Sequence, residues 1–184
     1  VEGSRLIDAP ARGITIEDIL PLAKEYELLV LYTSTPSFPN DVKIAEAFKY
    51  ENQNLIIGFC GAHVAINPDH CILASDAIDF VAGNEFDFTI KEIAEGKMLE
   101  QIDGLTYKKN NKPIHNKPRA LIDDMDSLPW VTKVYKDNLV TSDYYNGYML
   151  HPYMSFYTGR GCKSRCSFCL WPQTISGHNY RTRS

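Results

Sequence analysis

Short apolar runs alternate with polar or amphipathic stretches along the first hundred residues. The runs at residues 28–32, 55–59 and 78–82 predict three strands, and residues 5–8 predict a shorter strand before them. Helices are predicted between the strands: one from the Thr15 to Asp18 capping box to about Tyr26, one from Asn40 or Asp41 to about Tyr50, a weaker one over residues 68–75, and one over residues 88–95 that Gly96 ends. Strands that alternate with helices in this way are typical of a doubly wound α/β fold with an open parallel sheet.

Three loops would leave the carboxyl ends of these strands, at residues 33–37, 60–63 and 83–87. Ligands of open parallel sheets bind in the crevice outside those ends. All three loops are rich in small or polar residues, which would let a ligand approach the backbone closely. Tight turns between strands and helices need the same residue types, so the pattern leaves a ligand site and ordinary turns as alternatives.

The pattern changes after Gly96. Residues 104–107 and 113–115 flank a polar turn and predict a β-hairpin. Residues 117–148 have two prolines, three close aspartates and little periodicity, which indicates a linker, and residues 153–157 predict one more strand. We therefore expect three parts: an α/β domain over residues 1–100, a hairpin and linker over residues 101–150, and the start of a further domain over residues 151–184.

Charge divides the chain in the same place. Residues 151–184 carry five basic and no acidic side chains, whereas residues 1–150 carry 14 basic against 23 acidic ones. Five positive charges over that length are a thin patch beside the basic stripe of a nucleic-acid-binding protein, so we expect no nucleic-acid partner. A content of 44% hydrophobic and 23% charged residues is ordinary for a folded globular protein.

The sequence also bears on location. No apolar run approaches the roughly 20 residues of a membrane span, and the first residues lack the basic start and apolar stretch of a secretory signal. The first residue is Val1, so we expect a cut or processed amino end. Five cysteines are an odd number and are unevenly spread, which favours free thiols in a reducing cytoplasm. Cys60 and Cys71 are expected to be small, buried apolar residues.

The other three cysteines lie within eight residues, in the pattern Cys162-x3-Cys166-x2-Cys169. They follow the predicted strand at residues 153–157, so they would sit on a loop beyond its carboxyl end. Three thiolates on a short loop can hold three irons of a [4Fe-4S] cluster and leave the fourth iron open to another ligand. The stretch has no acidic residue, and it has cations such as Lys163 and Arg165, which favour thiolates and an anionic cluster.

A structural zinc site is the alternative. Cys162, Cys166 and Cys169 together with His178 supply four nitrogen and sulfur ligands, the number that a closed zinc site needs. Structural zinc sites more often pair two Cys-x2-Cys units, and this stretch has one. The sequence therefore leaves two functions of different class: an iron-sulfur enzyme, and a non-catalytic ligand-binding α/β module with a zinc-stapled tail.

The stretch from Arg160 to Cys169, with the aromatic Phe168 one place before the last cysteine, resembles the signature of radical S-adenosylmethionine (SAM) enzymes. The resemblance implies that Cys162, Cys166 and Cys169 bind the cluster, that SAM chelates the open iron, and that Phe168 packs near the SAM adenine. It also implies cleavage of SAM to a 5′-deoxyadenosyl radical that abstracts hydrogen, and an electron donor such as flavodoxin or ferredoxin. Residues 151–184 would then begin a (β/α) barrel.

The acidic part of the chain is similar to the cobalamin-binding domain, of flavodoxin-like strand order, that precedes the barrel in one branch of that superfamily. The matching pieces are residues 6–9, 33–37, 61–63 and 81–85, with residues 102–129 similar to the branch's linker. The resemblance implies cobalamin contacts from Thr33, Ser34, Thr35, Gly61, Ala62, His63, Gly83 and Glu85. It also implies that residues 5–8 are the second strand of the domain and that the opening strand is missing. An Asp-x-His-x-x-Gly motif for a cobalt ligand is absent, and His63 is expected to be a turn histidine and not a cobalt ligand.

The last residues narrow the resemblance further. Residues 170–174, 177–178 and 180–184 are similar to the hopanoid-biosynthesis-associated radical SAM proteins, which implies a small-molecule or lipid substrate such as a hopanoid side chain. The alternative is ordinary packing, with Trp171 and Tyr180 in a barrel core and with Arg181 and Arg183 on a solvated face.

Overall fold

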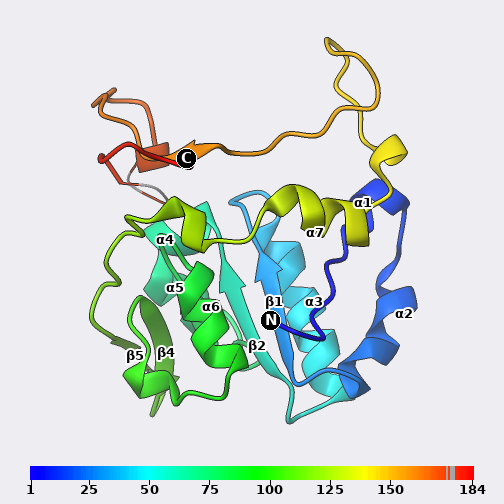
Figure 1. Cartoon of the computed structure of the whole chain (residues 1–184). Helices are drawn as coiled ribbons and strands as arrows, with labels where there is room; N and C mark the ends of the chain where they lie inside the picture. Colours follow the sequence, from blue (N-terminus) through cyan, green and yellow to red (C-terminus); the bar gives the residue numbers. More distant parts are fainter. Residues whose placement is uncertain (173, 175–176) are drawn as a thin grey trace.

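The computed structural model describes residues 1–172, 174 and 177–184. A five-stranded sheet lies at its centre, with the strand order β1-β2-β3-β4-β5 (Figure 1). Strands β1 Leu28–Tyr32, β2 Ile56–Cys60 and β3 Phe80–Ala82 are parallel neighbours. In the flavodoxin-like order 2-1-3-4-5 the last three strands are consecutive neighbours in the same way. The parallel part of the sheet therefore has the arrangement that the sequence predicts.

Helices cover both faces of the sheet. The helices, with short 3-10 turns marked η, are α1 Ala9–Arg12, α2 Ile16–Ile19, η1 Leu20–Lys24, α3 Phe38–Glu51, α4 Ala62–Ile66, α5 Pro68–Leu73, α6 Asp87–Ala94, η2 Leu99–Gln101, η3 Met125–Ser127, α7 Val131–Asn138 and η4 Thr141–Asp143. Alternate side chains of β1 point to opposite faces, so Leu29 and Leu31 join the core under α3, while Leu28 and Val30 join the core under α6. The doubly wound α/β prediction is confirmed.

Three of the predicted strands are confirmed to within two residues of their predicted ends, but the prediction of a strand at residues 5–8 is wrong. Asp8 instead caps α1, where its carboxylate accepts a hydrogen bond from Ala11 N at 3.4 Å, and Pro10 occupies the first turn of that helix. The N–H of Leu6 donates to Asn138 Oδ1 of α7 at 3.1 Å. The segment therefore has helix-capping and side-chain partners in place of a neighbouring strand.

The four predicted helices are present, with one change of type. Thr15 N and Oγ1 both lie within hydrogen-bond distance of Asp18 Oδ2, at 2.8 and 2.9 Å, so the predicted capping box does open the first helix. That helix continues as η1 and not as α-helix, because Pro21 near its start has no N–H for the α ladder. Of the turn predicted at residues 60–63, residues 62 and 63 instead begin α4, so His63, expected to be a turn histidine, lies in the first turn of a helix.

The predicted hairpin is confirmed, and it extends the sheet. Strand β4 Leu105–Lys109 pairs antiparallel with β3, and β5 Lys112–His115 pairs with β4. Asn110 and Asn111 form the turn with φ values of 52° and 57°, as a two-residue hairpin of type I′ requires. Within the predicted linker, residues 131–138 form α7.

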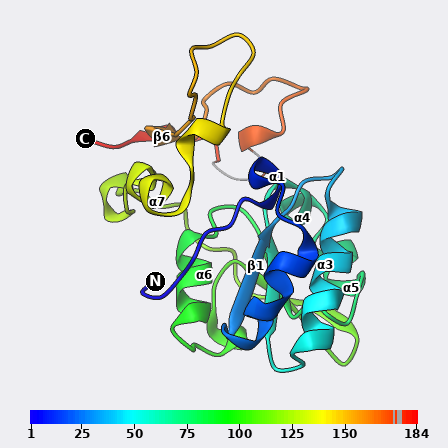
Figure 2. The same cartoon turned by 90° about the vertical axis from the view of Figure 1, so that its right-hand side faces the viewer.

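The prediction of a strand at residues 153–157 is wrong, because these residues pair with no other strand in the described part of the chain and β-pairing begins only at Gly159. Strand β6 Gly159–Arg160 pairs antiparallel with β7 Arg181–Thr182, and the two form a short ribbon. The N–H of Tyr153 donates instead to Tyr144 O at 3.0 Å. In both views the ribbon and the loop that it carries, orange to red, lie beyond the carboxyl ends of the parallel strands (Figures 1 and 2).

Gly58 of β2 allows β3 to pack closely beside it. A Cβ at Gly58 would overlap the ring of Phe80, which is fully buried on the neighbouring strand and has no room to move. We expect Gly58→Ala to lower the free energy of unfolding by about 1–3 kcal/mol, the usual cost of overpacking a core. Urea unfolding measures it. Gly147→Ala is the control, because a Cβ there meets nothing within 4 Å, and an equal loss in both variants would contradict the explanation.

Candidate functional site

The loop after β1 holds its shape through buried hydrogen bonds. Thr33 is fully buried, its N–H donates to Cys60 O at 2.8 Å, and its hydroxyl donates to Asp41 Oδ2 of α3 at 2.7 Å. Ser34 is bonded to Ser37 through both its N–H and its hydroxyl, at 2.9 and 3.0 Å. The Thr33 side chain therefore stabilises the loop from inside, which leaves Thr35 as the exposed threonine of the three-residue set predicted to bind cobalamin.

The loop after β2 approaches the loop after β1 very closely. Gly61 has φ 115°, and a Cβ on it would overlap the carbonyl oxygen of Thr33, so this position requires glycine. Helix α4 begins directly after it at Ala62. His63 lies across from the first loop, with its Nδ1 3.1 Å from Thr35 Oγ1 and its ring centroid 4.7 Å from that of Phe38. Thr35, Gly61 and His63 thus meet at the carboxyl edge of the sheet, as predicted from the sequence.

The loop after β3 uses its acidic residue differently from the prediction. The side chain of Glu85 is 1% exposed, and its Oε2 accepts hydrogen bonds from Ile122 N at 2.7 Å and from Arg181 Nη1 at 2.8 Å. Its Oε1 lies 3.4 Å from Arg160 Nη1. The carboxylate predicted to contact a cofactor is therefore bonded to the protein itself, whereas Gly83, two residues earlier, stays half-buried at the edge.

A second carboxylate completes this cluster. Asp87, the first residue of α6, binds Arg160 through two hydrogen bonds, Nη1 to Oδ2 at 2.6 Å and Nη2 to Oδ1 at 3.0 Å. These bonds raise the pKa of Arg160, chiefly through the hydrogen bond to Asp87. We call Glu85, Asp87, Arg160 and Arg181 the ion cluster. It contains two negative and two positive charges, and it joins the acidic part of the chain to the basic part.

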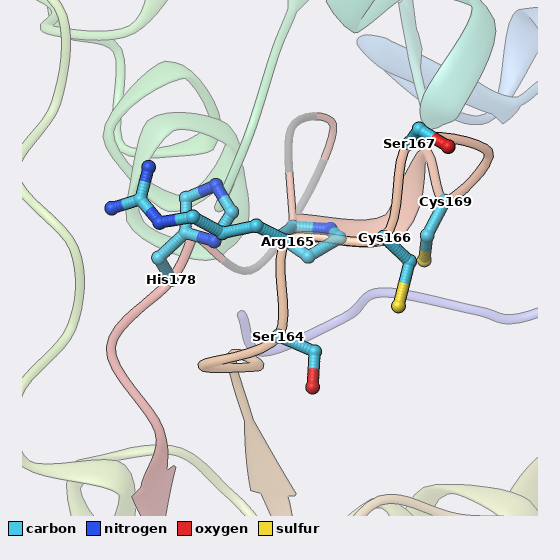
Figure 3. Close-up of a pocket in the computed structure, with 7 residues that line it drawn as sticks. Ser164, Arg165, Cys166, Ser167, Cys169 and His178 are labelled. Atoms are coloured by element: carbon cyan, nitrogen blue, oxygen red, sulfur yellow. The ribbon is translucent and has the colours of Figure 1, made fainter.

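The three clustered cysteines lie on the loop between β6 and β7. Cys166 is exposed, and Cys162 and Cys169 are half-buried. Cys166 and Cys169 line a hollow of about 190 Å³ together with Arg165 and His178, and their thiol groups point to the same side of the loop (Figure 3). Within residues 1–172, 174 and 177–184, no three His, Cys, Asp or Glu side chains gather closely enough to hold a metal ion.

The donor groups of this loop fit a metal or cluster in kind. All three cysteines are free thiols, and Arg165 lies in the same hollow, where its charge would favour thiolates. The Nδ1 atom of His178 is buried without a hydrogen-bond partner among the residues that the structure describes. Both the cluster ligand set and the zinc alternative with His178 stay predictions. Phe168 is 89% exposed, so its ring is open to a partner.

The two cysteines outside the motif differ from these three. Cys60 and Cys71 are buried, and burial is the main cause that raises the pKa of Cys60 to about 12 and that of Cys71 to about 11. Thiols with such pKa values stay protonated near neutral pH. The prediction that these two are small buried apolar residues is confirmed by their burial.

The partners of Arg160 and Arg181 are not predicted by any motif in the sequence. Arg160 belongs to the stretch that resembles the cluster signature, and a solvated face for Arg181 is the alternative to the resemblance of the tail. The structure contradicts that alternative for Arg181, which is 8% exposed and binds Glu85. The opposite charges of the two parts of the chain were the only available signal. Net charge indicates that two regions attract each other, but it does not say which residues pair.

No protein-family model matches the chain. An uncharacterized methyltransferase of Pyrococcus horikoshii, PH0819, is 31% identical over 171 residues, which are 90% of this chain and 36% of the relative. Two solved structures of TsrM from Kitasatospora setae, a radical SAM methyltransferase, superpose on 98% of this chain. One has tryptophan substrate and a SAM analogue bound, with a TM-score of 0.69 and 15% identity; the other has cobalamin and a [4Fe-4S] cluster bound, with 0.66 and 16%.

A structure of OxsB, a cobalamin-dependent SAM radical enzyme, superposes on 97% of this chain with a TM-score of 0.58 and 19% identity. The chain spans 36% of the length of the Pyrococcus relative, 37% of TsrM and 24% of OxsB. Within the described residues, the structure contains no helix both long and apolar enough to cross a bilayer. The superpositions show that this chain shares its fold with part of TsrM and part of OxsB.

His63 provides a test of the carboxyl edge. Burial is the main cause that lowers the pKa of His63 from its ordinary value of 6.5, and the nearby charge of His70 lowers it further, so the neutral ring is favoured. The unfolded chain then binds more protons than the folded chain below about pH 6.5, and stability falls as the pH falls through that range. We expect an NMR titration, assigned with His63→Gln, to give a His63 pKa below 6.5, and His70→Gln to raise it. A His63 pKa above 6.5 in the unsubstituted chain would refute this environment.

Proposed function

We propose that this chain is the cobalamin-binding and cluster-binding portion of a radical SAM methyltransferase that acts on a small-molecule or lipid substrate. The observation that carries the proposal is the position of the cysteine loop. The ribbon at its base is bonded through Arg160 and Arg181 to Glu85, on the loop that leaves β3 at the ligand-binding edge of the sheet. The similarity to a methyltransferase and to the fold of TsrM supports methyl transfer as the reaction.

In this proposal Cys162, Cys166 and Cys169 hold the cluster, and the positive charge of Arg165 lies in the same hollow as Cys166 and Cys169. Phe168 offers its exposed ring to the SAM adenine. When bound, a [4Fe-4S] cluster with an open iron would supply the one electron that splits SAM into methionine and the 5′-deoxyadenosyl radical, and cobalamin would supply a methyl carrier. The protein's part is to bind both groups, to orient them and to exclude water.

Cobalamin would lie against the carboxyl edge of the sheet. Thr35, Ala62 and His63 are at least partly exposed there, and Gly83 is half-buried beside Ala65. Gly61 is buried, and its missing side chain lets the second loop pack against the backbone of Thr33. Thr33 and Glu85 contribute in another way, since their side chains are engaged inside the protein and hold the loops that carry the contacts. The electron donor, the hopanoid side chain as substrate and the cytoplasmic location stay predictions.

The cluster is tested by metal content. After anaerobic reconstitution with iron and sulfide we expect about four irons per chain, and at least a fivefold loss in Cys166→Ala, because one thiolate ligand is gone. Cys71→Ala is the matched control, a buried cysteine of α5 outside the motif, and it should keep its iron. One zinc and no iron per chain, with the zinc lost in His178→Ala, would replace the proposal with the zinc-stapled binding module.

Cobalamin binding is tested separately by equilibrium dialysis with hydroxocobalamin. We expect Thr35→Trp to weaken binding at least tenfold, because the bulky ring would fill the edge that Thr35 exposes. Asn54→Trp introduces the same ring on an exposed turn before β2, at the opposite edge of the sheet, and should leave binding unchanged. Equal affinity in both variants would remove cobalamin from this edge.

A further inference from the structure

Arg160 and Arg181 stand at the base of the cysteine loop. They are register partners in the β6–β7 ladder, so the chain leaves the ribbon after Arg160, passes through the three cysteines, and returns at Arg181. Glycines flank Arg160: a Cβ on Gly161, whose φ is 90°, would overlap the carbonyl oxygen of Asn179. The ribbon is therefore tightly closed, and its orientation sets the orientation of the loop.

Both guanidinium groups reach the same carboxylate from different strands. Arg181 binds Glu85 Oε2, whereas Arg160 faces Oε1. A contact from one strand would let the ribbon turn about it, but two contacts from paired strands to the two oxygens of one group fix the direction of the ribbon. Arg160 is held again by Asp87, and Arg181 again by the carbonyl oxygen of Ile122 at 2.6 Å.

We propose that Glu85 is a positioning residue that fixes the cysteine loop in one orientation over the carboxyl edge of the sheet. This rests on the proposed function, since it assigns the orientation of the cluster toward the cofactor at that edge. Glu85 lies two residues after Gly83 on the same loop.

The test uses the protein at its natural length, reconstituted with iron, sulfide and cobalamin. Glu85→Gln keeps the size of the side chain and removes the charge that both arginines bind. We expect SAM cleavage per cluster to fall at least tenfold while iron per chain stays within twofold of the unsubstituted protein. The electron paramagnetic resonance signal of the reduced, SAM-bound cluster should broaden, a change that loss of stability alone would not produce. Glu85→Asp should restore part of the rate.

Glu92→Gln is the matched control. It breaks a more exposed pair on α6 with the same chemical change, since Arg119 Nη2 lies 2.6 Å from Glu92 Oε2 and neither residue contacts Arg160 or Arg181 by an ion pair that the structure shows. We expect its rate per cluster to stay within twofold of the unsubstituted protein. Equal rates and equal spectra for Glu85→Gln and Glu92→Gln would overturn the positioning role.

Two further outcomes concern a Glu85→Gln variant that does not fold and an unsubstituted protein that binds no iron. If Glu85→Gln does not accumulate as folded protein, Arg160→Lys replaces it, because it keeps the positive charge and loses the two-pronged contact with Asp87. A tenfold fall per cluster in Arg160→Lys supports the role, and an unchanged rate overturns it. An unsubstituted protein that binds no iron overturns the proposed function and this inference together, whereas a failure confined to the Glu85 comparison leaves the proposed function standing.

Discussion

The buried carboxylate of Glu85 is the constraint on which the arrangement of the two parts of the chain depends. Removing an ionised carboxylate from water costs several kcal/mol, and well-placed partners must offset that cost. The backbone N–H of Ile122 and the guanidinium of Arg181 do so at 2.7 and 2.8 Å. Losing one partner of such a pair would leave a buried charge uncompensated, at a cost of about 3–5 kcal/mol. The basic ribbon therefore has a single favourable position, over the loop after β3.

The carboxyl edge beneath this ribbon is equally constrained. Gly61 lies against the carbonyl of Thr33, and the Thr33 hydroxyl is bonded to Asp41 of α3, so the first two loops form one tightly packed surface. Rigid loops on a rigid sheet hold a ligand without a large loss of conformational entropy on binding. Because Glu85 belongs to the third loop, the same edge supports both the expected cofactor contacts and the base of the cysteine loop.

The α/β fold could be predicted from the sequence because its signals are local. The apolar run of β1 and the Asn110-Asn111 turn each depend on neighbouring residues, and the structure agrees with both. The strands predicted at residues 5–8 and 153–157 do not form, because a strand needs a pairing partner and a local apolar pattern does not show whether there is one. The role of Glu85 in the ion cluster could not be predicted for the same reason. Its partners Ile122 and Arg181 lie 37 and 96 residues away in the sequence.

The contacts of the basic residues explain much of the charge difference between residues 1–150 and residues 151–184. Of the five basic residues in the C-terminal part, Arg160 and Arg181 are bound to carboxylates, and the guanidinium of Arg183 lies 4.4 Å from the centroid of the Trp130 ring. In the part of the chain that the structure describes, Lys163 and Arg165 form no ion pair. These two lie between Cys162 and Cys166 in the sequence. The basic residues thus divide into three that contact the rest of the chain and two that lie among the cysteines.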